Sequence, residues 1–422
     1  MADEIKNIRL TQKQLDILIN NHEKYASGRM GGVRANLSHQ NLSGLSFAKR
    51  NMSDADFTGA ILADADLREA KLDRAVLFCA DLRNANLRKA SLVRADCRGA
   101  LLRGANLAAS NMTGIDLREG SLAKATTDGT LNAAHKEHKA GDKGGANLSG
   151  ANLSGAKMSG AVAAASNFSD ATMKSVKLSK SSLKDANFSG ANLENADLSE
   201  CDLTGVNLQS AILIGTAINL SEVLPENKKG ILTSETVGKS EKDLGMPLDQ
   251  LIKLHKIWVD SSGQKGRKLD ISAFDLRNNV GFVNAELTMM RGVGAILYGV
   301  NFTKTQLQLV DLHEADLRHA NFKSADMRGG NYSQSMLNNA SFEKAQLQPL
   351  ILPSGRTLPT NMSNARLRYV DFTGANLQHV NFHGADLSDA NFVGAKLEGA
   401  NFSEAKLDGV HMDIDQKKFT PQ

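Results

Sequence analysis

Apolar residues recur at every fifth position over the first long stretch of the chain. From Leu37 to Leu122, eighteen successive positions of this register hold Leu, Phe or Met, with Cys97 as the exception. Two residues before each of these centres the side chain is small, and from Ala55 to Ala105 it is alanine eleven times in succession. A period of five matches neither the 3.6 residues of a helix nor the 2.0 of a strand. The chain must therefore turn every five residues, with centre and alanine pointing inward, which predicts a solenoid.

The repeating unit has the form A(D/N)Lxx, as in Ala65-Asp66-Leu67 and Ala85-Asn86-Leu87. This unit resembles that of the pentapeptide repeat family. The resemblance implies a right-handed quadrilateral β-helix with four repeats in each coil. We therefore expect an all-β solenoid of several pentapeptide arrays, with short capping and linking α-helices.

Breaks in the register divide the chain into nine segments. We expect a capping helix and a glycine-rich bend (1–33), array 1 (34–127), a degenerate cap or linker (128–145), array 2 (146–220), a linker with a second capping helix near 248–261 (221–270), array 3 (271–347), a proline-rich loop (348–361), array 4 (362–412) and a tail (413–422). Gly292 occupies a centre of array 3, so we expect it to leave a hole in the column.

Two stretches follow a helical period instead of the period of five. Over residues 11–26 the apolar face is formed by Leu15, Leu18, Ile19, His22 and Tyr25, and Thr11 with Gln14 can form a capping box. The same spacing returns in Leu248, Leu251, Ile252, His255 and Trp258, which indicates an internal duplication. Each helix is expected to cover an open end of a solenoid, and its histidine to be a packed capping residue.

Composition narrows the class of protein further. No stretch approaches the 18 apolar residues of a transmembrane helix, and the first residues do not read as a signal peptide. Three cysteines make no disulfide framework, with Cys79 expected at an outward position as an ordinary surface thiol. We therefore expect a reduced, cytoplasmic protein, and the leading functional hypothesis below adds that it is bacterial.

The sequence offers no catalytic or metal-binding constellation. His135 and His138 lie three residues apart, but two ligands do not make a metal site and no Cys or carboxylate completes one at a recognisable distance. Nucleophile, base and orienting group do not recur together anywhere. We expect no enzyme activity, no cofactor and no bound metal.

Charge in array 1 is the most informative surface feature. With four repeats per coil, residues twenty apart stack at strand spacing, and several arginines then stack on arginines. The candidate contacts for an anionic partner are Arg68 on Arg88, Arg74 on Arg94, Arg83 on Arg103 and Arg98 on Arg118. From Arg68 to Arg103, nine basic residues accompany four acidic ones. Two interpretations stay open: long arginines splayed apart in water, or a surface for an anionic partner.

Three functional hypotheses follow. The leading one is a non-enzymatic bacterial scaffold that presents flat β faces to a protein partner, with self-association through the solenoid ends as a further expectation. The alternative is binding of nucleic acid or an anionic lipid surface by the arginines of array 1. The resemblance also implies a third role, since some pentapeptide repeat proteins imitate DNA and bind DNA gyrase. A DNA mimic should be strongly acidic, whereas this chain has a net charge of +4.

Overall fold

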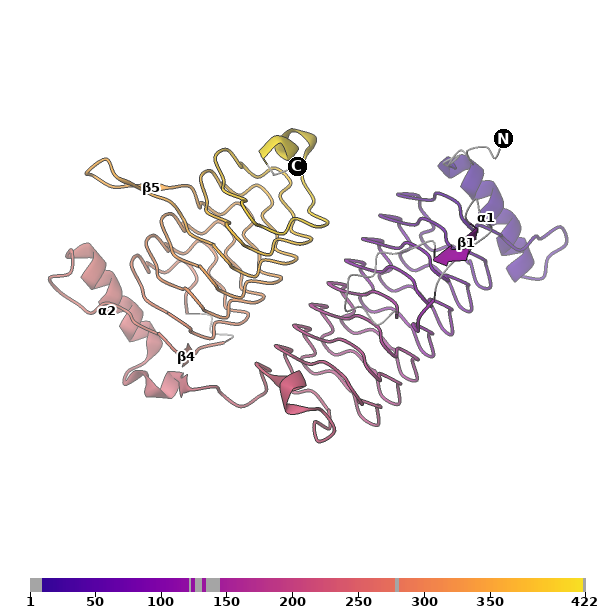
Figure 1. Ribbon diagram of the computed structural model, residues 1–422, viewed down its shortest axis with the longest axis horizontal. Coiled ribbons are helices and arrows are strands. Elements are labelled where there is room, and N and C mark those ends of the chain that lie inside the picture. The colour runs from indigo at the N-terminus through magenta and orange to yellow at the C-terminus, as the bar shows by residue number, and fades with distance from the viewer. Residues whose placement is uncertain (1–9, 121–122, 126–130, 134–144, 278–280, 420–422) are drawn as a thin grey trace. The chain divides into compact units, whose positions relative to one another are not determined.

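The computed structural model describes residues 10–120, 123–125, 131–133, 145–277 and 281–419, and most of these form single β-bridges separated by turns (Figure 1). The longer elements are α1 (Gln12–Ala26), β1 (Ala123–Ala125), β2 (Leu131–Ala133), η1 (Pro225–Lys228), β3 (Lys239–Ser240), η2 (Glu241–Leu244), α2 (Leu248–Asp260), β4 (Phe274–Asp275), β5 (Leu350–Ile351), β6 (Thr357–Leu358) and η3 (Ile414–Phe419).

Parallel bridges between residues twenty apart build the β-helix. Asp66 pairs with Asn86, and Asn86 with Asn106. At each bridge the backbone forms two hydrogen bonds, such as Leu67 N–H to Asn86 O at 2.8 Å and Asn86 N–H to Ala65 O at 2.9 Å. One coil therefore contains four five-residue repeats, which is the coil size implied by the resemblance.

The residue before each centre explains why the chain turns there. Asp66 Oδ1 accepts the backbone N–H of Arg68 at 3.2 Å, and the N–H of Ala70 donates to Leu67 O at 3.1 Å. Glu69 adopts a φ of 57°. A positive φ at the third residue is the mark of a type II turn. Asp and Asn favour such turns because their side chains bond to the backbone two residues further on.

The chain forms two compact units, residues 1–234 and 235–422, and each has its own hydrophobic core. In unit 1 the first two arrays form one column, because Leu101 bridges to Asn147 and Asp116 to Val162. The segment between them is an insertion, in which β1 pairs antiparallel with β2. The predicted end of array 1 at residue 127 is therefore too late. Most of the predicted cap at 128–145 lies outside the described residues.

Unit 1 continues beyond the predicted boundary at residue 220. Ile212 bridges to Leu232, and the N–H of Leu208 donates to Asn227 O at 2.7 Å. Val223 is buried against the end of the core. The predicted linker 221–270 therefore begins too early, because its first residues complete the last coil.

Arrays 3 and 4 also form one column, that of unit 2. Asn331 bridges to Asn361, thirty residues on instead of twenty, so ten residues leave the β-helix at this point. They include the antiparallel hairpin β5–β6, which projects from the coils (Figure 1). The predicted proline-rich loop is therefore a hairpin.

Inward positions are filled as the period predicts. Leu87 and Ala85 are fully buried, as are most other centres and alanines of both columns. Near the column ends the inward positions are only partly buried, as at Ile218 and Leu407. In unit 2, phenylalanine rings one coil apart stack with centroids 4.8 to 5.2 Å apart, along Phe282, Phe302, Phe322, Phe342, Phe372 and Phe392. The hole predicted at Gly292 is absent from this described column, because a Cβ there would lie 2.8 Å from Leu312 Cδ2.

Candidate interaction surfaces

Side chains of the capping helix α1 bond to backbone groups of the first coil, which has no preceding coil to pair with. Gln12 donates through Nε2 to Ser46 O and accepts the N–H of Ser46, both at 2.9 Å. Glu23 accepts the N–H of Asn51 at 3.0 Å and forms an ion pair with Arg50. These contacts satisfy backbone groups that an uncapped edge would leave open to another chain.

The two capping histidines make matching contacts. His22 Nδ1 accepts the N–H of Ala35 at 3.0 Å, and its Nε2 lies 3.0 Å from Ser53 O. Likewise His255 Nδ1 accepts the N–H of Leu269 at 2.9 Å, and its Nε2 lies 3.0 Å from Thr288 O. Because Nδ1 accepts, the proton resides on Nε2 and the ring is neutral.

Burial lowers the pKa of both histidines. Both rings are fully enclosed, so these histidines hold the caps in place and are structural residues. The predicted apolar face of α1 is narrower than expected, since Leu18 and Tyr25 are 39% and 44% exposed.

Aspartates pair with most of the candidate arginines. Arg68 binds Asp66 through Nε and Nη2 at 2.8 and 2.6 Å, and Arg74 binds Asp54 of the preceding coil in the same way. Like Arg68, three further arginines pair with the aspartate two residues earlier: Arg83 with Asp81, Arg98 with Asp96 and Arg118 with Asp116. The bonds from Arg68 and Arg74 lower the pKa of Asp66 and Asp54. Both spacings are visible in the sequence: Asp and Arg two residues apart, and Asp54 twenty residues before Arg74.

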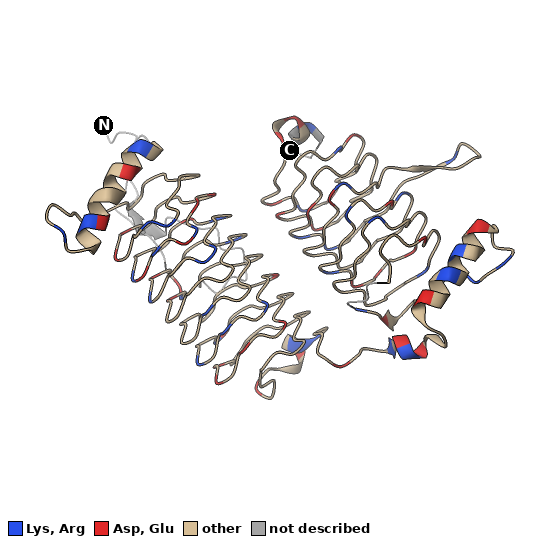
Figure 2. Ribbon diagram, turned by 180° about the vertical axis from the view of Figure 1, so that it is seen from behind, with Lys and Arg blue, Asp and Glu red and all other residues tan. Residues whose placement is uncertain are grey.

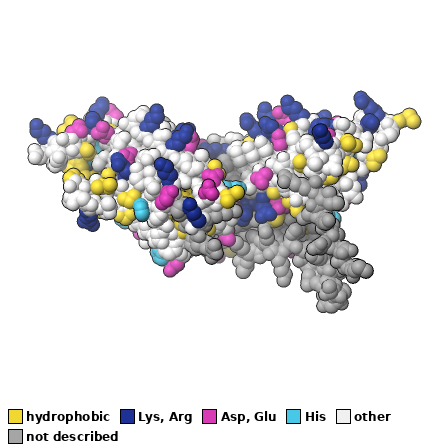
Figure 3. Space-filling view, turned by 90° about the horizontal axis from the view of Figure 1, so that it is seen from above, with side chains coloured by type: hydrophobic (Ala, Val, Ile, Leu, Met, Phe, Trp, Pro, Cys, Tyr) yellow, Lys and Arg dark blue, Asp and Glu magenta, His cyan; other side chains and the backbone are white. Residues whose placement is uncertain are grey.

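The arginines do not share one face. The bridge ladders through Asp66 and Asn86, through Lys71 and Ser91, through Asp81 and Leu101, and through Asp96 and Asp116 form the four sides of the coil. Each side carries one of the four predicted arginine pairs. Basic and acidic residues are both scattered along the coils (Figure 2), and both charges are interspersed in the space-filling view (Figure 3). Arg88 and Arg94 are exposed and have no ion pair within the described residues.

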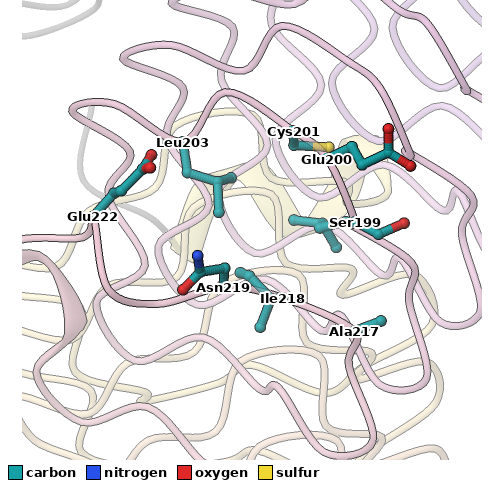
Figure 4. A pocket seen from close by; sticks show the side chains of 9 residues that line it. Ser199, Glu200, Cys201, Leu203, Ala217, Ile218, Asn219 and Glu222 are labelled. Carbon is teal, nitrogen blue, oxygen red and sulfur yellow. The ribbon is translucent and has the colours of Figure 1, made fainter.

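A pocket of about 460 Å³ lies at the last coil of unit 1. Glu200, Cys201 and Leu203 come from one segment, and Asn219 and Glu222 from the next (Figure 4). The thiol of Cys201 donates to Leu178 O at 3.1 Å, and burial raises its pKa. A thiol held in this way is a poor nucleophile.

The structure also bears on the remaining candidates from the sequence. No group of three or more potential metal ligands occurs within the described residues, and His135 and His138 lie outside them. Cys79 is buried, not a surface thiol as predicted. Among the helices that the structure describes, none has the length and apolar character needed to cross a membrane.

Family comparison decides what kind of protein these coils form. A model described as pentapeptide repeats (8 copies) matches residues 51–77, 80–118, 146–185, 181–218, 295–331 and 315–348. A second, described as a pentapeptide repeat region, matches residues 332–402. Together these matches span more than half of the chain. The chain belongs to the pentapeptide repeat family.

Solved pentapeptide repeat structures are among the similar chains. QnrB1, a plasmid-mediated fluoroquinolone resistance protein, is 17% identical over 48% of this chain and 87% of its own, with a TM-score of 0.28. HetL of Nostoc sp. strain PCC 7120, involved in heterocyst differentiation regulation, is 18% identical over 92% and 94%, with a TM-score of 0.17. Rfr23 of Cyanothece 51142 is 27% identical over 31% and 88%, with a TM-score of 0.16. No curated protein matches the chain. Because every TM-score is below 0.5, the family assignment rests on the repeats.

Proposed function

We propose that this pentapeptide repeat protein is a non-enzymatic scaffold that binds a protein partner in the bacterial cytoplasm. The observation that carries the proposal is the hairpin β5–β6 of unit 2. The coils on either side of it bridge directly to each other, Asn331 to Asn361 and Met336 to Arg366. The β-helix therefore does not need the hairpin to close its ladder.

The hairpin is nevertheless an ordered structure with an apolar side chain turned outward. Leu350 pairs with Leu358, and the N–H of Leu352 donates to Arg356 O at 2.9 Å. Ile351 is 70% exposed. An exposed aliphatic side chain on a preorganised hairpin suits a shallow apolar groove on another protein, because little entropy is lost on binding.

Deletion of the hairpin tests this proposal. Removal of residues 349–358 together with Pro359→Gly restores five-residue spacing from Leu347 to Met362 and places glycine at the turn position that needs a positive φ. We expect the variant to keep its melting temperature within a few degrees and to lose a partner that the complete chain captures from native lysate. Ile351→Ser, which keeps the hairpin, is the matched variant and should weaken the same capture. If both variants capture the same proteins as the unaltered chain, the hairpin is not the binding element.

A second candidate is binding of an anionic partner, nucleic acid or lipid, through the arginines of array 1. Arg88 and Arg94 support it most, because they are exposed and lack an ion pair within the described residues. Arg88→Gln with Arg94→Gln should then flatten the salt dependence of binding. Arg68→Gln is the control, since Asp66 already occupies its guanidinium.

Two further roles complete the proposal. Self-association through the last coil of unit 2 would cover Leu407, Val410 and Met412, which are only partly buried. Light scattering at several concentrations would detect it. A DNA-mimicking, topoisomerase-directed role is the least favoured, because a net charge of +4 is the wrong sign for a duplex mimic.

A further inference from the structure

The outer surface of the N-terminal cap combines exposed basic and apolar side chains. On α1, Leu15, Ile19 and His22 face the coils. Residues four and seven positions apart share a helix face, so Lys13, Ile17 and Lys24 lie together on the opposite side. All three are exposed, Ile17 at 62%.

The bend after α1 extends this surface. The N–H of Gly32 donates to Arg29 O at 3.3 Å, and Gly31 has a φ of 75°, so Met30 occupies the corner of a tight turn. Met30 is 99% exposed and Val33 is 64% exposed. The N–H of Val33 donates to Asn21 O at 3.1 Å, which ties the bend back to the helix. The bend projects past the coils at the end of α1 (Figure 1). We define Lys13, Ile17, Lys24, Arg29, Met30 and Val33 as the outer cap surface.

Acidic groups are directed away from the outer cap surface. Glu23 pairs with Arg50, and Asp16 accepts a bond from Gln12. The sequence has no Asp or Glu from Lys24 to Ser53. Within the described residues Lys13, Lys24 and Arg29 have no ion pair. The surface therefore presents positive charge around apolar side chains.

The duplicated cap of unit 2 shows that folding does not require this pattern. There Lys253 pairs with Asp249 at 3.3 Å, and Lys256 pairs with Asp260 and Glu286. Its bend, residues 261–268, keeps basic residues but has no counterpart of Met30 or Val33. Both caps bond to their coils through a histidine, but at the positions of Lys13, Ile17 and Lys24 the second cap has Met246, Gln250 and Ile257, so it lacks these lysines.

We propose that the outer cap surface binds an anionic lipid bilayer, with α1 lying along the interface and Met30 entering among the head groups. Lys and Arg are attracted to anionic head groups, and apolar side chains add binding by leaving water. A nucleic acid would use the basic residues but would gain little from Met30 and Val33. This surface belongs to unit 1 and is independent of the hairpin of unit 2, so the two proposals can fail separately.

Sedimentation of the full chain with vesicles tests the proposal. We expect binding to phosphatidylcholine vesicles that contain phosphatidylglycerol, and far weaker binding to phosphatidylcholine alone. The triple variant Lys13→Gln, Lys24→Gln, Arg29→Gln should lower the partition about a hundredfold, near fivefold for each charge. Met30→Ser should lower it about tenfold.

The control is the double variant Lys253→Gln, Lys256→Gln in α2, which should leave the partition nearly unchanged. Equal binding to both vesicle types, or an equal loss in the α2 variant, would overturn the proposal. A partition that falls in the triple variant but not in Met30→Ser would also overturn it, because the proposed mode of binding requires Met30 to enter among the head groups. Unchanged melting temperatures of the variants establish that the fold is intact.

Discussion

Protonation of His255 should loosen the cap of unit 2. The neutral ring accepts the N–H of Leu269 through Nδ1 and donates through Nε2 to Thr288 O. When Nδ1 gains a proton it faces another donor, and the first bond is lost. Because burial lowers the pKa of His255, the unfolded chain takes up the proton first, near the ordinary value of about 6.5. Stability is therefore full above this pH and falls as the pH decreases toward the folded-state pKa.

The size of the effect follows from the two bonds. His255→Asn is too short to reach both partners, so it leaves an N–H and a carbonyl of the first coil unpaired. A buried polar group without a partner costs about 1 to 3 kcal/mol, so we expect a loss of about 2 to 4 kcal/mol. His379→Asn, at an exposed turn position of unit 2, is the control and should cost less than about 0.5 kcal/mol.

Trp258 provides the assay. It is the single tryptophan of the chain, and its ring is stacked 5.7 Å from that of His255. Its fluorescence should change with a midpoint below pH 6.5 and should follow the unfolding of this cap in urea. A midpoint at or above 6.5, or equal urea stability of His255→Asn and His379→Asn, would refute the assigned role of the imidazole.

Three other predictions test the core and the N-terminal cap. Leu87→Ala should cost about 2 to 5 kcal/mol by leaving a cavity in the column, whereas Arg88→Gln should cost little; equal shifts in melting temperature would contradict the inward register. Tyr332→Phe should stabilise unit 2 by about 1 kcal/mol, since the buried hydroxyl has no hydrogen-bond partner among the described residues; calorimetry showing a loss would reveal a hidden partner. Deletion of residues 1–32 removes the side chains that pair with Ser46 and Asn51, so light scattering should show self-association, and a monomer of unchanged stability would make α1 dispensable.

The sequence by itself determined the local design of this protein. A period of five with an inward alanine is short-range information, and it predicted which residues are buried, as Leu87 and Ala85 are. Thr11 and Gln14 form the predicted capping box, because helix ends also depend on near neighbours. Spacing alone likewise revealed the second helix, with the histidine that repeats His22.

Tertiary structure decided whatever depends on which coil lies against which. The bridge from Leu101 to Asn147 joins two arrays across an insertion, and no local pattern specifies that closure. Gly292 leaves no hole because the side chain of Leu312, one coil further on, occupies the space beside it. The sequence places Asp66 two residues before Arg68 and Asp54 twenty residues before Arg74, but only the fold decides which aspartate each guanidinium reaches. Ion pairs, core cavities and the ends of arrays all depend on which residues stack in neighbouring coils. In a solenoid the ladder of bridges between coils sets that stacking.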